Sequence, residues 1–228
     1  MLPSETQAVF FDAVGTLIEP WPLATEVYAN VGLRHGMSLM PSDVARRFQQ
    51  AFQREEEQDR RAGWIVDEDR ERRRWQSIVE FVFGSSPHLP ALFQELYSHF
   101  ADPHAWRVCA DVGQVLQALS ARGCLLGLAS NFDHRLHRIA DAKPELSFLR
   151  RRVISSEAGW RKPAPAFFDA VIRAADCERG KIVFVGDSLQ NDFEGAQAAG
   201  LVAILLDRRA EAGSRRITRL GELLWPPL

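Results

Sequence analysis

The residues best suited to chemistry stand directly after short apolar segments of this sequence, or in the loop that follows one. They are Asp12, Ser130, Asn131, Lys162, Asp187 and Asp192. In an open parallel sheet, ligands bind beyond the carboxyl ends of the strands, so polar side chains at those ends can meet in one place. If the apolar segments are strands of one sheet, these residues form a single polar site.

Asp12, Asp187 and Asp192 would place their carboxylates at this sheet edge. Carboxylates held close together repel one another unless a cation lies among them. Oxygen-rich, water-accessible sites suit Mg²⁺. The sequence therefore predicts a magnesium site, and a cation in that position indicates a phosphorylated substrate.

Ser130 and Lys162 supply groups that a phosphate needs. A phosphate is held by hydrogen-bond donors and by a fixed positive charge. Lys162 precedes Pro163 and an apolar helical pattern, which indicates a loop that delivers the lysine just before a helix begins. Each residue alone is typical of a turn or a surface, so the inference depends on the whole set.

The apolar segments have the length of buried strands. They cover residues 8–11, 125–129, 153–155, 182–185 and 202–206. From the second segment onward, apolar residues at helical spacing lie between them, as at Val112, Val115 and Leu119. Alternating strands and helices predict an α/β fold built on a doubly wound parallel sheet.

A long insertion separates the first strand from the second. Residues 20–104 carry apolar residues at helical spacing throughout, for example Val44, Phe48 and Phe52. This periodicity predicts an inserted helical cap domain.

The core domain would then comprise residues 1–19 and 105–228, and the cap residues 20–104. We expect hinges near residues 19–22 and 104–109, because the chain crosses there into and out of the insertion. A cap on two hinges is expected to move over the site.

The charged residues of the insertion are mixed in sign. Between Asp43 and Arg74, Arg residues alternate with Asp and Glu, which is typical of solvated helix faces. Trp64, Trp75 and Arg74 can face either the site or the bundle interior. The interior is favoured for Trp75, which shares an apolar stripe with Ile78.

The composition limits the classes of molecule that the protein is expected to bind. The 228 residues carry a formal charge of −2, and the sequence pI of about 6.3 provides no basic field for nucleic acid or an anionic membrane. The N-terminus lacks a signal-like segment, and the apolar runs are too short to span a bilayer. We expect a cytoplasmic protein whose partner is a small phosphorylated molecule; the sequence does not indicate an oligomeric state.

Taken in order, the polar segments resemble the motifs of haloacid dehalogenase-like hydrolases. The matching residues are Asp12 to Thr16, Ser130-Asn131, Lys162, and Gly186-Asp187 with Asn191-Asp192. The resemblance spans the whole predicted core, and the insertion lies where this family places its helical C1 cap. Residues 130–136 and 158–163 further resemble a phosphatase-like branch. The resemblance implies a Rossmann-like core.

The resemblance also implies a role for each residue. Asp12 would be the nucleophile and would form an aspartyl phosphate. Mg²⁺ would be bound by Asp12, Asp187, Asp192 and the backbone carbonyl of Val14. Ser130 and Lys162 would bind the transferring phosphoryl group, and Lys162 would also offset the charge of Asp12. Thr16 and Asn131 would complete the substrate-binding set.

Val14 departs from the pattern of the family's phosphatases. These usually carry Asp two residues after the nucleophile, where it protonates the leaving oxygen and later activates water. Such groups are worth ~10²–10⁴-fold in rate, so we expect slow hydrolysis of alkyl phosphates and less effect on acyl or aryl phosphates. Residues that could replace this acid are Glu19, His35, His99 and His104.

Two other functions stay open. The segment from Asp12 to Leu17 also resembles the nucleophile motif of metal-independent 2-haloacid dehalogenases, although Asp187 and Asp192 would oppose a carboxylate substrate without a cation. A catalytically weak binding protein is the non-enzymatic alternative. A phosphonate hydrolase is disfavoured because residues 20–104 contain no Lys for a Schiff base.

Overall fold

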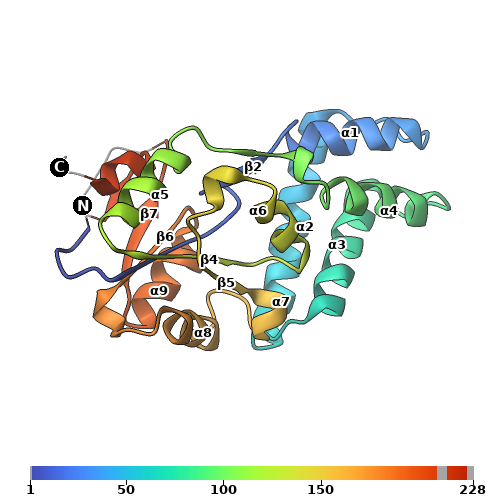
Figure 1. The fold of residues 1–228 in the computed structure, drawn as a ribbon. Coiled ribbons are helices and arrows are strands. Elements are labelled where there is room, and N and C mark those ends of the chain that lie inside the picture. Colours follow the sequence, from blue (N-terminus) through green and yellow to red (C-terminus); the bar gives the residue numbers. More distant parts are fainter. Residues whose placement is uncertain (1, 210–214, 225–228) are drawn as a thin grey trace.

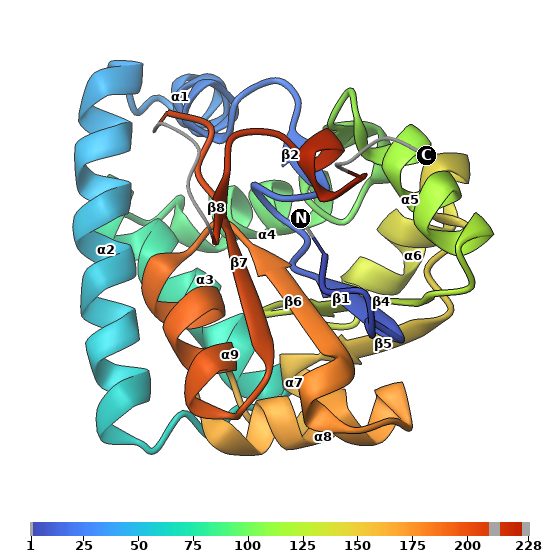
Figure 2. The same ribbon diagram turned by 90° about the vertical axis from the view of Figure 1, so that its left-hand side faces the viewer.

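The computed structural model describes residues 2–209 and 215–224. Its main feature is a parallel sheet with strand order β5-β4-β1-β6-β7-β8 (Figures 1 and 2). The strands are β1 (Ala8–Phe11), β4 (Leu125–Ser130), β5 (Arg151–Ile154), β6 (Ile182–Gly186), β7 (Val202–Leu206) and β8 (Arg216–Ile217). The predicted doubly wound α/β fold is confirmed.

Helices cover both faces of this sheet. Along β1, Val9 and Phe11 face one side and Ala8 and Phe10 face the other, and all four are fully buried. Helices α5 (Val112–Ala121) and α6 (Arg135–Asp141) pack on the first face, and α8 (Pro165–Ala175) and α9 (Gly195–Ala198) pack on the second (Figure 1). Burial on both faces explains why the strands read as continuous apolar runs.

Several short elements were not predicted. They are the edge strand β8, the strands β2 (Ile18–Pro20) and β3 (Trp106–Val108), the helix α7 (Ser155–Ala158), the short 3-10 helices η1 (Pro103–Ala105), η2 (Pro144–Leu146), η3 (Arg179–Lys181) and η5 (Leu220–Leu224), and the π-helix η4 (Leu189–Glu194). Strands β2 and β3 pair in antiparallel fashion and form a separate ribbon. The chain enters the insertion through β2 and leaves it through β3.

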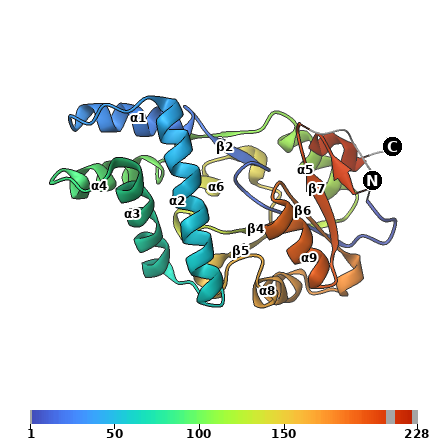
Figure 3. The same cartoon turned by 180° about the vertical axis from the view of Figure 1, so that it is seen from behind.

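The insertion is helical, as predicted. Its helices are α1 (Ala24–Arg34), α2 (Pro41–Arg61), α3 (Glu68–Phe83) and α4 (Leu89–His99). They share an apolar cluster that includes Tyr28, Val44, Val79 and Leu92. Helix α2 runs along one side of the molecule and faces both the other cap helices and the core (Figures 2 and 3). The domain limits at residues 19/20 and 104/105 stay a prediction.

The expectation of solvated charges in the insertion is wrong for part of it. Glu55, Asp59, Glu71 and Arg74 are buried. Helices α2 and α3 pack side by side, so carboxylates of one helix pair with guanidinium groups of the other, and opposite charges can be buried when they are paired.

Within residues 2–209 and 215–224, no helix combines the length and the apolar character needed to cross a membrane.

Candidate functional site

The sheet register brings the predicted polar residues together. Strand β1 lies between β4 and β6, and all three run parallel, so their carboxyl ends are adjacent. Asp12 follows β1, Ser130 ends β4, and Asp187 follows β6. Residues separated by more than a hundred positions therefore share one sheet edge.

Lys162 lies at the centre of the site. It is only 2% exposed, and its Nζ donates to Asp12 Oδ1 at 2.6 Å, to Asp192 Oδ1 at 2.6 Å and to the carbonyl of Ala129 at 3.2 Å. Burial opposes its charge, but Asp12 and Asp192 raise the pKa of Lys162 above the usual lysine value. The ammonium is thus a fixed positive charge.

Asn131 holds the backbone on which Lys162 stands. Its side chain donates to the Lys162 carbonyl at 3.0 Å and accepts from the Lys162 amide at 2.7 Å. The side chain of Asn131 therefore fixes the loop before α8. Asn131 also lines the cavity described below.

Asp12 presents one bonded and one free oxygen. Its Oδ1 accepts from the Ser130 hydroxyl at 2.9 Å and from Lys162. Within the described part of the chain, no donor reaches Oδ2. An oriented carboxylate with a free oxygen can act as a nucleophile.

Asp12, Asp187 and Asp192 each offer a carboxylate oxygen within 4.8 Å of the others. Enclosure by the protein, with repulsion from Asp12 and Asp192, raises the pKa of Asp187 to about 7, even though this side chain keeps accessible surface. When all three are ionised, the carboxylates exceed the Lys162 ammonium by two negative charges. The donor set therefore fits a hard divalent cation.

The turn after β1 shapes this cluster. Gly15 has φ +90°, and a Cβ atom there would lie 2.3 Å from Asp187 Oδ2, so only glycine fits. The hydroxyl of Thr16 donates to Asp187 Oδ1 at 3.4 Å, which places Thr16 on the carboxylate side of the site. Among residues 2–209 and 215–224, no donor reaches the Val14 carbonyl oxygen, which leaves it free for a cation.

The segment η4 positions Asp192. The Ser188 amide donates to Asp192 Oδ2 at 2.9 Å, and the Ser188 hydroxyl accepts from the Asn191 amide at 3.1 Å. The side chain of Asn191 then reaches the cap, where it donates to Glu56 at 2.8 Å.

A cavity of about 340 Å³ joins the sheet edge to the cap. Its core end is lined by Asp12, Val14, Ser130, Asn131, Lys162, Asp187 and Asp192. The cap end is rich in aromatic side chains and includes Trp75, which also packs against the apolar cluster of the bundle, where the sequence placed it. Trp75 is half-buried, because the apolar stripe of α3 continues into the cavity wall.

The four residues considered as replacement acids do not line this cavity. In the described structure, Glu19 pairs with Arg107, His35 with Glu95 and His104 with Asp102. His99 packs edge-on against Phe100, and its Nε2 is buried without a partner among the described residues.

The cap carboxylates that do line the cavity, Glu56 and Glu71, were missed. A signal existed for Glu56, because it follows Phe48 and Phe52 at four-residue steps along the cavity-facing stripe of α2.

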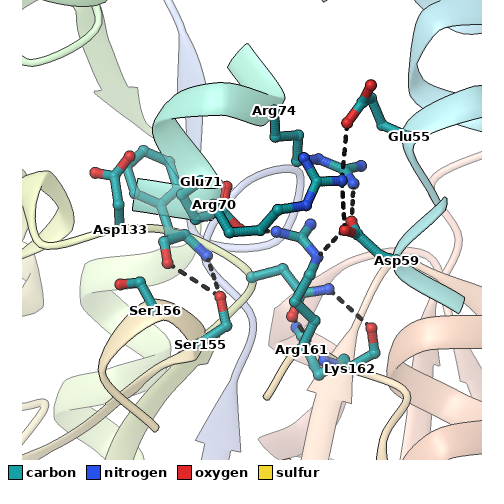
Figure 4. Close-up of polar contacts among 12 residues, drawn as sticks. Glu55, Asp59, Arg70, Glu71, Arg74, Asp133, Ser155, Ser156, Arg161 and Lys162 are labelled. Carbon is teal, nitrogen blue, oxygen red and sulfur yellow. Dashed lines mark hydrogen bonds and ion pairs between the residues drawn. The ribbon is translucent and has the colours of Figure 1, made fainter. Parts of the chain in front are cut away.

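Arg161 joins the core to the cap beside Lys162 (Figure 4). Its guanidinium pairs with Glu71, and its Nε lies 3.5 Å from Asp59. Arg70 and Arg74 bind the same Asp59, so the carboxylate is shared among the three guanidinium groups (Figure 4). Burial lowers the pKa of Arg161 to about 10, with the cap carboxylates opposing the shift, and the group stays charged at neutral pH.

Comparisons with known proteins agree with this architecture. The family model described as haloacid dehalogenase-like hydrolase matches residues 6–200. Haloacid dehalogenase-like hydrolase domain-containing protein 3 of Danio rerio is 28% identical over 206 residues, which cover 88% of this chain and 85% of that protein. Glyceraldehyde 3-phosphate phosphatase of Methanothermobacter thermautotrophicus is 25% identical over 217 residues, or 92% and 89% of the two chains.

Among solved structures, the magnesium-bound HAD-hydrolase YfnB of Bacillus subtilis has a TM-score of 0.78 at 17% identity. The match covers 96% of this chain and 97% of that one. At this identity the likeness concerns the fold.

Proposed function

Because the chain belongs to the haloacid dehalogenase-like hydrolase family, we propose that it is a magnesium-dependent phosphatase of a small phosphorylated molecule. The observation that carries this proposal is the arrangement around Asp12. Lys162 and Ser130 hold one oxygen of Asp12, and Asp187 and Asp192 lie within cation-binding distance. This combination is suited to an in-line attack on phosphorus.

In the proposed reaction, Asp12 Oδ2 attacks phosphorus, and the bond from phosphorus to the leaving oxygen breaks. The resulting aspartyl phosphate is then attacked at phosphorus by water, which releases phosphate and restores Asp12. Lys162 and the Ser130 hydroxyl bind the phosphoryl oxygens as they move between these partners. Asn131 keeps Lys162 in place through the loop backbone.

The cation would be held by Asp12, Asp187, Asp192 and the carbonyl of Val14. When bound, magnesium supplies positive charge that offsets the phosphoryl oxygens. Thr16 supports this side of the site through Asp187.

Val14 gives a specific reason to keep 2-haloacid dehalogenation as a second candidate, because that reaction needs no acid at this position. The carboxylates of Asp187 and Asp192 weigh against it, since they would repel a haloacid in the absence of a cation. A binding protein without turnover is the third outcome that an assay must distinguish.

Acetyl phosphate is the substrate for the first test, because its acyl leaving group departs without an acid. We expect hydrolysis that requires magnesium and falls below detection in Asp12→Asn, with both proteins showing the same cooperative unfolding. Turnover of 2-chloropropionate without metal would instead establish the dehalogenase. Inertness of the wild type toward both compounds would favour a binding protein.

A further inference from the structure

We propose that the substrate is an aryl phosphate whose aromatic group carries no second negative charge and lies in the cap end of the cavity. This inference rests on the proposed phosphatase activity and specifies the leaving group. It is drawn from the walls of the cavity, from the pairing of its charges and from Val14.

The cap end of the cavity has aromatic walls. Tyr28, Phe48, Phe52 and Trp75 form a connected set, with ring centroids 5.3 Å apart for Tyr28–Phe48, 4.8 Å for Phe48–Phe52 and 5.7 Å for Phe52–Trp75. These separations are those of favourable aromatic pairs, and a bound ring can extend the set.

The size of the cavity suits one ring system. A cavity of about 150 Å³ admits benzene, and this one has a volume of about 340 Å³. It therefore has room for a phosphoryl group at Asp12 and an aromatic group against the cap.

The arginines at the cap end are already paired. Arg74 binds Asp59, Arg161 binds Glu71 and Asp59 (Figure 4), and Arg135 binds Asp133. Glu56 adds a further carboxylate to the wall. A second phosphate or a carboxylate on the substrate would have to break one of these pairs, so the site selects against it.

Tyr28 offers a neutral polar contact instead. It is 1% exposed, lines the cavity, and its hydroxyl has no hydrogen-bond partner among residues 2–209 and 215–224. Burial raises the pKa of Tyr28, so the hydroxyl remains a donor. A ring with an uncharged polar substituent can therefore be accommodated.

Val14 independently favours an aryl leaving group. The side chain beside Asp12 cannot donate a proton. A phenol ionises near pH 10, as tyrosine does, so phenolate can leave with the electron pair of the broken phosphorus–oxygen bond and take its proton from water afterwards. Alkoxides are far more basic and need an acid during the step.

The first test compares 4-carbamoylphenyl phosphate with 4-carboxyphenyl phosphate, which match in size and differ in charge. We expect kcat/KM to be at least tenfold higher for the carbamoyl compound. Equal rates, or a preference for the carboxylate, would overturn the proposed charge selection.

The second test replaces one aromatic wall residue. Phe52→Leu should lower the ratio of kcat/KM for phenyl phosphate to that for acetyl phosphate about tenfold, the size of one good aromatic contact. Phe81→Leu is the matched control, because Phe81 lies on α3 and is 36% exposed, and it should leave the ratio unchanged.

Acetyl phosphate separates the two proposals. Hydrolysis of acetyl phosphate that depends on Asp12, with no effect of Phe52→Leu on the ratio, overturns the aryl inference and leaves the phosphatase proposal standing. Inertness toward acetyl phosphate and every aryl phosphate overturns both.

Discussion

At the scale of single residues, the proposed reaction makes Val14 the position that limits which leaving groups can depart. Val14 and Asp12 both line the cavity. We expect Val14→Asp to raise kcat for an alkyl phosphate such as cyclohexyl phosphate by ~10²–10⁴-fold, because a carboxyl group could then protonate the leaving oxygen. The gain should be much smaller for phenyl phosphate. Steady-state kinetics of both compounds measure the difference.

Val14→Asn is the control for that change, because it has similar size and polarity but no proton to transfer. An equal gain in Val14→Asn would show that polarity, and not proton transfer, limits the wild type.

Lys162 is a second residue whose removal should have a large effect. Its ammonium holds Asp12 and Asp192, and all three side chains are buried. Lys162→Met leaves both carboxylates without their partner, so we expect the free energy of unfolding of the metal-free protein to fall by about 3–5 kcal/mol. Urea unfolding in the presence of a chelator measures this.

Lys181→Met is the matched control, because within the described part of the chain the Lys181 side chain pairs with Glu178 alone, at 3.1 Å and at the surface. Such a pair is worth ~0.2–1 kcal/mol. Equal destabilisation by the two variants would contradict a structural role for the Lys162 pairs.

At the scale of elements, the sequence predicted those that carry long apolar patterns. Strands β1, β4, β6 and β7 were found at or within one residue of the predicted limits, because burial on both faces leaves an uninterrupted apolar run. The ribbon strands β2 and β3 span three residues each, which is too short for a periodic signal.

The core end of the site was also predictable, because parallel strands of one sheet end at the same edge. The cap end of the site was not predictable. Whether Glu71 and Trp75 face solvent, the bundle or the cavity depends on how α3 docks against the core loop at Arg161, and a helical stripe does not encode that docking.

A further contact between cap and core involves Glu68 at the start of α3. It accepts from the His134 amide at 2.9 Å and from the Ser156 hydroxyl at 2.5 Å, and it pairs with the His134 ring. Burial opposes ionisation, but these bonds lower the pKa of Glu68 below 4.5. Its stabilising contribution is therefore present above pH 4.5 and is lost as the pH falls through the folded-state pKa.

We expect Glu68→Gln to lower the free energy of unfolding at pH 7 by about 0.5 kcal/mol, a small value because the pair is partly solvated. The difference from wild type should shrink as the pH falls below 4.5. Urea unfolding across this range, with the exposed α3 residue Glu80→Gln as control, provides the test. A difference that grows toward low pH would contradict this account.

At the scale of the whole molecule, the cavity is built from both parts of the chain. Asp12, Lys162 and Asp187 come from the sheet edge, whereas Phe52 and Trp75 come from the insertion. Three features connect the two parts around the cavity. They are the ribbon β2–β3, the ion pair of Arg161 with Glu71, and the hydrogen bond from Asn191 to Glu56. The cap is predicted to move on its hinges, and such a movement would open this boundary to a substrate.

Magnesium should stabilise the entire fold, because the folded chain gathers carboxylates that are far apart in the unfolded one. At a concentration of 100 Kd, a ligand that binds only the folded state adds ~2.7 kcal/mol. For a chain of 228 residues this corresponds to a rise in Tm of roughly 5–10 °C. Asp187→Asn should remove most of this rise, because Asp187 is one of the clustered carboxylates.

Asp207→Asn is the matched control, since Asp207 also follows a strand of the sheet, β7, but lies outside the carboxylate cluster. Its Tm should rise with magnesium as much as that of the wild type. An equal rise in both variants would place the stabilising ion elsewhere on the molecule. No rise in the wild type would mean that the folded site does not bind magnesium and that Lys162, together with protonation of Asp187, offsets the carboxylates. The proposed reaction would then have to proceed without the cation.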